Sequence, residues 1–244
     1  GNNMRYITTS GTITVNGTLT FQNTGTGVTA MSGGNIEMKG ATITLAGTGI
    51  FQGTTNLNIS GTGDQTLTSS WAANPNRNIP TVTINKASGT LSLAGYILTS
   101  NAWTYTAGTL DPGTSTVIFG FDGDSTVTIN NTMAALNNVR FDTYTDQQRY
   151  ITTSGTITVN GTLTFQNMST GIAVLNGGTI EMKGSTITLA GTSIFQGTTN
   201  VLINGEGSQA LTSSYAANPN RNIPSVTINK TNGSTLTLSG YIHA

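Results

Sequence analysis

The sequence predicts an all-β protein, a right-handed parallel β-helix (β-solenoid) that forms a single elongated rod. The first observation behind this prediction is repetition, because Arg5–Asn23 recurs letter for letter as Arg149–Asn167, a spacing of 144 residues. A chain that repeats itself over such a length is built by stacking copies of one unit. The second observation is patterning: strands of four or five residues, punctuated by Gly or Asn, point their apolar residues one way.

The opening block shows the pattern most clearly. In Thr12–Val15 the threonines alternate with Ile13 and Val15, so hydroxyls line one face of a strand and aliphatic groups the other. Asn16-Gly17 then marks a turn, since Asn and Gly tolerate positive φ. Such a turn joins an antiparallel hairpin or forms a corner between two strands of one solenoid coil. The long-range repetition favours the corner.

The same phrase returns in diluted form along the chain, which predicts coils of roughly 20–25 residues each. An antiparallel β-sandwich is the main rival fold. The clearest later strands are expected at Thr42–Leu45, Gln65–Thr68, Thr81–Asn85, Thr90–Leu93, Ser115–Phe119 and Ser125–Ile129.

The repeat also divides the chain. Residues 5–148 form a first β-solenoid unit, and residues 149–244 form a second, truncated unit that continues the first. The one length change between them lies where Asn85–Thr90 becomes Asn229–Thr235, which is one residue longer. Because an extra residue inside a strand would reverse its faces, we expect a turn at Ala87–Gly89.

Composition narrows the function classes. Only 7% of residues are charged, and nine basic and nine acidic residues cancel, so no field attracts nucleic acid. The sequence contains no run of 18 apolar residues, so we expect no membrane insertion. The absence of cysteine excludes disulfides and thiolate zinc sites. The low charge and the repeats favour an extracellular or cell-surface location.

Acidic residues are scarce, and Asp122-Gly123-Asp124 is their densest pair. Asp122 and Asp124 are weak candidates for a Ca²⁺ site, but the EF-hand spacing is missing and a solvated turn explains them as well. They lie too close in sequence to flank a glycosidic bond. Glu37 and Lys39 share a strand face and predict an exposed ion pair that recurs at Glu181 and Lys183. No catalytic residue and no cofactor is expected.

The best binding candidate is a loop with two prolines that contains Trp71 and Arg77, together with its repeat around Tyr215 and Arg221. An exposed aromatic ring beside Asn and Arg can stack on a sugar and bond its hydroxyls. The alternative is that the ring folds back and covers the edge of the solenoid.

Ranks of Thr-x-Thr on a solenoid also resemble the ice-binding faces of some antifreeze proteins. The alternative is that outward positions of an uncharged strand require β-branched polar residues. The motifs are irregularly spaced in the sequence, which speaks against an ice-binding face.

The phrases Gly11–Phe21, Gln65–Ser69 and Thr81–Lys86 resemble repeats in large bacterial cell-surface β-helix proteins, which are adhesins and filament or sheath components. The resemblance covers nearly all of the chain and implies an extracellular structural or adhesive role. It carries no catalytic residues.

These observations predict a structural segment of a long extracellular repeat protein, a stalk, fibre or filament subunit that stacks end to end on itself or on further repeats. A carbohydrate-binding adhesin that holds surface glycans through the Trp71 and Tyr215 loops is the alternative. A β-helix enzyme that degrades polysaccharides is disfavoured by the scarcity of charge.

Overall fold

The computed structural model describes residues 4–25, 27–47, 50–71, 79–99, 101–121, 126–132, 135–143, 148–167, 171–191, 194–215, 222–231 and 233–244. Within them the chain is an all-β parallel β-solenoid without a helix, as the sequence predicts. The chain divides into two compact units, Gly1–Val117 and Ile118–Ala244, which are described separately.

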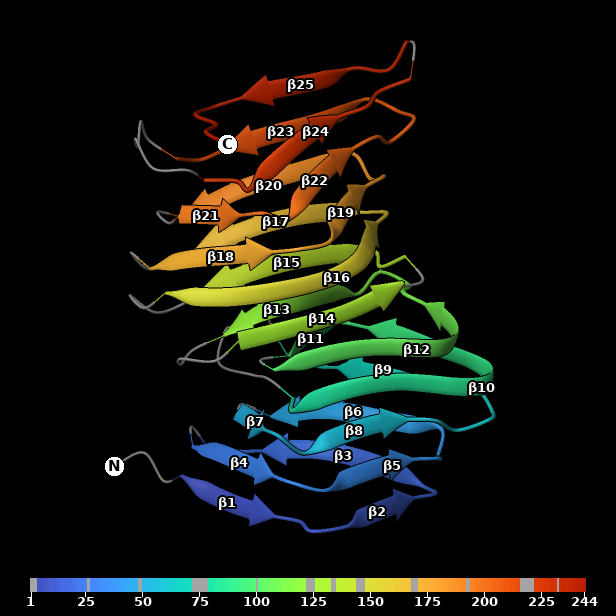
Figure 1. Ribbon diagram of the computed structural model, residues 1–244. Coiled ribbons are helices and arrows are strands. Elements are labelled where there is room, and N and C mark those ends of the chain that lie inside the picture. Colours follow the sequence, from blue (N-terminus) through green and yellow to red (C-terminus); the bar gives the residue numbers. More distant parts are fainter. Residues whose placement is uncertain are drawn as a thin grey trace. The chain divides into compact units, whose positions relative to one another are not determined.

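The first unit contains twelve complete strands, and β13 (Thr116–Phe121) spans the boundary to the second. The first three turns each carry two short strands on one side and one strand on the other, whereas the later turns carry one long strand in place of the short pair (Figure 1). The strands are β1 (Arg5–Thr8), β2 (Thr12–Val15), β3 (Thr18–Asn23), β4 (Val28–Ser32), β5 (Asn35–Met38), β6 (Thr42–Gly47), β7 (Ile50–Gly53), β8 (Asn56–Ile59), β9 (Gln65–Ser69), β10 (Thr81–Ala94), β11 (Tyr96–Thr99) and β12 (Ala102–Asp111).

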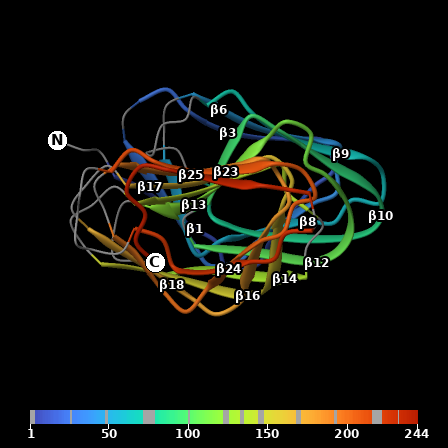
Figure 2. The same ribbon diagram turned by 90° about the horizontal axis from the view of Figure 1, so that it is seen from above.

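The second unit repeats this arrangement. Seen from above, β17, β23 and β25 lie on one side of its coil, and β16, β18 and β24 on the other (Figure 2). Its strands are β14 (Thr126–Thr132), β15 (Asn138–Thr143), β16 (Arg149–Val159), β17 (Thr162–Asn167), β18 (Ile172–Asn176), β19 (Thr179–Met182), β20 (Thr186–Gly191), β21 (Ile194–Gly197), β22 (Asn200–Ile203), β23 (Gln209–Ser213), β24 (Ser225–Ile228) and β25 (Leu236–Ser239).

Strand pairing within each unit is parallel between successive coils. β2 pairs with β5, β5 with β8 and β8 with the first half of β10, so the Asn16-Gly17 turn is a solenoid corner and not a hairpin. The pairing partners Asn35 and Asn56 are 21 residues apart, whereas Gln209 and Leu236 are 27 apart. The longest coils therefore exceed the predicted length. The coil is right-handed in each unit (Figure 1), as parallel crossover connections nearly always are.

The core of each coil is narrow and apolar. Ile43, Leu45 and Leu67 are fully buried, while the threonines between them face outward, as the alternation predicts. In the second unit, stacking from coil to coil continues through a column of rings, with centroids 5.8, 5.5 and 5.3 Å apart along Phe119, Phe141, Phe165 and Phe195.

The predicted turn at Ala87–Gly89 takes an unexpected form. β10 runs through it as one continuous strand of 14 residues, so the segment is part of a strand. Its pairing with β12 nevertheless shifts register between Ile84 and Asn85 and again between Asn85 and Thr90. The first half of β10 pairs with β8 and its second half with β9. The strand therefore bends around a corner without a break.

Candidate functional site

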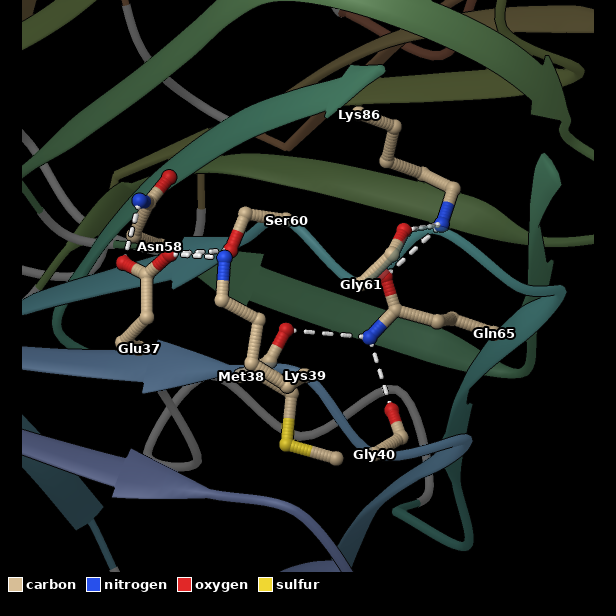
Figure 3. A network of polar contacts seen from close by, with 9 residues as sticks. All are labelled: Glu37, Met38, Lys39, Gly40, Asn58, Ser60, Gly61, Gln65 and Lys86. Atoms are coloured by element: carbon tan, nitrogen blue, oxygen red, sulfur yellow. Dashed lines mark hydrogen bonds and ion pairs between the residues drawn. The ribbon is translucent and has the colours of Figure 1, made fainter. Parts of the chain in front are cut away.

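The most elaborate polar arrangement in the first unit lies inside this corner. Lys86 is a buried residue of β10, and its ammonium group donates to the carbonyl oxygens of Gly61 and Gly63 at 2.6 and 2.8 Å. A third hydrogen bond, of 2.8 Å, reaches Oε1 of Gln65 (Figure 3). An ammonium group has three donors. All of them are used, and two of the acceptors are backbone groups of the preceding coil.

Gln65 extends the network by one more coil. Its side-chain amide nitrogen donates to the carbonyl oxygens of Met38 and Gly40, at 3.1 and 2.7 Å (Figure 3). Gly61 has no room for a side chain, because an added Cβ would lie 2.5 Å from the Lys39 carbonyl oxygen and 2.7 Å from the Gln65 amide. Lys86 and Gln65 therefore connect three successive coils through hydrogen bonds to backbone carbonyls.

Burial also affects the charge of this lysine. Removal from water lowers the pKa of Lys86 below its usual value, and the nearby carboxylate of Asp64 opposes that change. Asp64 itself accepts a hydrogen bond of 2.8 Å from the backbone N–H of Thr90, on the far side of the corner.

The second unit contains the same network 144 residues later. Lys230 donates to the carbonyl oxygens of Gly205 and Gly207 and to Oε1 of Gln209, at 2.5, 2.6 and 2.7 Å. The amide of Gln209 reaches the carbonyl oxygens of Met182 and Gly184 at 3.0 and 2.6 Å. Lys230 is half-buried, whereas Lys86 is buried. The network is therefore a property of the repeat unit.

A carboxylate cluster lies beside this corner network. Glu37 accepts hydrogen bonds from the Asn58 amide at 2.6 Å and from the Ser60 hydroxyl, and it pairs with Lys39 at 2.7 Å (Figure 3). Burial acts to raise the pKa of Glu37, but the hydrogen bonds from Lys39, Ser60 and Asn58 and the charge of Lys39 outweigh it and lower that pKa. The predicted ion pair is confirmed, and it belongs to a larger cluster.

The equivalent cluster in the second unit uses different partners. Glu181 accepts from the Asn204 amide at 2.7 Å and from the Thr158 hydroxyl at 3.2 Å, and it pairs with Lys183 at 2.9 Å. The hydrogen bonds from Asn204 and Lys183 lower the pKa of Glu181, against the opposing effect of burial. Leu202 stands where the first unit has Asn58. Each carboxylate thus accepts hydrogen bonds from a neighbouring coil, but the donor residues differ between the two units.

The two networks join successive coils. Glu37 and Lys86 each have several hydrogen-bond partners within the protein, as a structural cross-link requires. In the described part of the chain, no three His, Cys, Asp or Glu residues group as metal ligands do.

The aromatic residues nominated as ligand contacts are placed alike in the two units. Trp71 and Tyr215 are both buried, which agrees with the alternative of a ring that folds back and not with an exposed ring. The backbone N–H of Trp71 donates to Ser69 Oγ at 3.1 Å, and that of Tyr215 to Ser213 Oγ at 3.2 Å. The hydroxyl of Tyr215 also donates to the Ala190 carbonyl oxygen of the preceding coil at 3.4 Å. Arg77 and Arg221, like Asp122 and Asp124, lie outside the described residues.

The threonine ranks are more regular than the sequence suggests. Register places Thr18, Thr42 and Thr66 in one row across β3, β6 and β9, and Thr20, Thr44 and Thr68 in the next. The expected irregular spacing is wrong for this sheet, and ice binding stays a prediction.

Sequence reasoning missed the corner network, although a signal was present. Gly61-x-Gly63-x-Gln65 with Lys86 recurs as Gly205-x-Gly207-x-Gln209 with Lys230. The spacing alone does not show that the ammonium turns inward.

Comparisons with protein-family models, with curated proteins and with solved structures found no match to this chain. No described helix is long and apolar enough to span a membrane. A function for this chain therefore has to be inferred from its coil and its polar networks.

Proposed function

We propose that this chain is a structural segment of a long extracellular repeat protein, a stalk, fibre or filament subunit whose coils stack end to end. The observation that supports this most directly is the use of one sequence in two positions. Arg5–Asn23 forms a coil of the first unit whose strands β1, β2 and β3 pair, among the described strands, on one edge alone, with β4, β5 and β6. The identical Arg149–Asn167 is covered on both edges within the second unit.

This double use means that the coil edge is a general joint. The same nineteen residues accept a neighbour above in both copies and a neighbour below in one of them. In a stack of repeats, each added unit contributes backbone hydrogen bonds and aliphatic surface at one such joint, so stability grows with neighbouring units. The buried Lys86 and Gln65 network adds a polar link between later coils of the first unit.

The mechanism that we propose is mechanical. Parallel backbone pairing between coils and a continuous aliphatic core resist bending and proteolysis, because few backbone groups are free to unfold locally. The low charge and abundant threonine fit a surface that is solvated by uncharged hydroxyls. The resemblance to bacterial surface repeats supports a location of such a segment outside the cell.

Electron microscopy of chains with one, two and three copies of the 144-residue unit tests this proposal. We expect thin particles of constant width whose length increases in equal steps with each copy. A control chain with Ile157→Asp, which places a charge in the core, should lose the regular steps. Globular particles of increasing diameter would contradict a structural stalk or fibre.

A further inference from the structure

The edge formed by β24 and β25 is the most exposed apolar part of the second unit. β24 pairs only with β22 and β25 only with β23 among the described strands. Ile228 and Leu238, which continue the inward-facing columns, are 57% and 58% exposed. Unpaired backbone groups beside exposed aliphatic side chains form a ready template for another strand.

The first unit shows what covers the equivalent edge. β10 is the counterpart of β24 and β25, and β12 pairs along both of its halves. Val82 lies opposite Trp103, Ile84 opposite Tyr105, and Leu91 opposite Leu110. Trp103 and Ile84 are both fully buried in this arrangement. In the first unit, the segment that covers this edge is therefore Ala102–Asp111.

The fit extends to the lysine corner. Gly108 of β12 lies directly on Lys86, and a Cβ added at Gly108, where φ is +122°, would come within 2.7 Å of Lys86 Cβ. The hydroxyl of Tyr105 donates to the Gly108 carbonyl oxygen and holds this bend. A strand that crosses the lysine corner therefore needs glycine at this position, in addition to apolar residues on either side.

The extra residue of the second copy does not disturb this fit. β12 crosses the corner in few residues: Ala107 lies opposite Asn85 and Thr109 lies opposite Thr90, and Gly108 packs on Lys86 although residues 86–89 have no pairing partner in the register. The insertion falls in the matching segment between Asn229 and Thr235. The paired positions on each side of the corner are unchanged in character.

We propose that the open edge of β24 and β25 is a docking site for a strand of the Ala102–Asp111 type, supplied by a further repeat unit. Trp103, Gly108 and Leu110 of such a strand would lie over Val226, Lys230 and Leu236. The chain's own Ala102–Asp111 is already paired with β10, so the occupant is a second copy of this segment. This inference rests on the proposed function and names the partner of the joint.

The test uses the full 244-residue chain, lengthened after Ala244 by a copy of residues 100–121. Gly240-Tyr241 corresponds to Gly95-Tyr96, so the copied segment follows its natural neighbour. Hydrogen exchange is measured at low protein concentration on the amides of β24 and β25. We expect exchange to slow by at least about tenfold on lengthening, since each newly closed edge must open before it exchanges.

Two control extensions sharpen the result. One carries Trp103→Asp and Gly108→Val in the copied segment, and the other contains the same residues in scrambled order. We expect neither to slow exchange. Equal protection by the scrambled extension would mean that any strand suffices, and no protection by the native one would mean that the edge does not accept it. Either result overturns the proposal.

A third outcome concerns the unlengthened chain. Protection of the same amides that rises with protein concentration would show that the first coil of another molecule occupies the edge, which also overturns the assignment. The proposed function has a separate test, because microscopy can show stepwise particles even when this particular strand fails to dock. If the strand docks but microscopy shows no stepwise particles, the docking site stands and the proposal of a stalk or fibre is wrong.

Discussion

Two identical stretches of this protein have different environments. Ile13 in the first coil is 50% exposed, whereas Ile157, the same residue in the same nineteen-residue sequence, is 1% exposed. Ile7 and Ile151 differ in the same direction. Because local sequence is constant, the whole difference comes from the neighbouring coil: β14 pairs below β16, and no described strand pairs below β2.

Other residues of the block show where stacking matters and where it does not. Phe21 and Phe165 are buried in both copies, since each ring is covered by a phenylalanine of a later coil, Phe51 or Phe195, at 5.4 and 5.3 Å. Tyr6 and Tyr150 are exposed in both. A coil therefore specifies which side chains face inward, and its neighbours decide how much of that surface leaves water.

The largest expected effect tests this directly with Ile157→Ala and its matched control Ile13→Ala. Truncating a fully buried isoleucine leaves a cavity and costs about 2–5 kcal/mol, so Ile157→Ala should lower the free energy of unfolding by that amount. Ile13→Ala removes a half-exposed side chain and should cost about 1 kcal/mol or less. Urea unfolding of both variants measures the difference. Equal losses would show that the first coil is already covered in solution.

A second, smaller contrast separates the two lysine corners. Lys86→Met removes the donor for two backbone carbonyls and Gln65 in a buried site, and it should destabilise the protein by about 2–3 kcal/mol. Lys230→Met should cost about 1 kcal/mol, because Lys230 is only half-buried and water can reach the acceptors that lose its ammonium group. Urea unfolding again provides the measurement.

The control for the lysine pair is Gln65→Leu, alone and combined with Lys86→Met. Since the two side chains share one hydrogen bond, the double variant should lose less stability than the sum of the single variants. Strict additivity would mean that the network does not act as a unit, and the difference between the two corners would then need another cause.

Much of the fold is predictable from the sequence because the pattern is repeated. Thr12–Val15 shows the alternation, Arg149–Asn167 shows the stacking, and the strict period at inward positions such as Ile43 and Ile187 makes them core residues. Local sequence does not reveal that Asn16-Gly17 is a corner, since a hairpin uses the same residues. Only pairing with distant coils separates these possibilities.

The candidate site was harder to predict for a physical reason. A lysine is expected at the surface, and nothing local to Lys86 shows that three acceptors from an earlier coil will surround it. The sequence leaves two placements open for Trp71 for the converse reason, since an aromatic residue in a proline-containing loop has no periodicity that assigns it to the core. Both cases concern contacts between residues that belong to different coils or loops.

The smallest contrast concerns Glu37 and Glu181, whose pKa values are both lowered in the folded state. A lowered carboxyl pKa stabilises the fold above the unfolded value of about 4.3, and this stabilisation disappears as the pH falls through the folded value. Each site lies partly in solvent, so Glu37→Gln and Glu181→Gln should each remove at most about 1 kcal/mol at pH 7. Urea unfolding at pH 7 and at pH values below 4 should show variants that converge on the parent protein in acid, because the parent's carboxylates are then protonated. A variant that stays equally destabilised in acid would show that the amide disrupts packing. The loss of stability would then not come from the charge of the carboxylate.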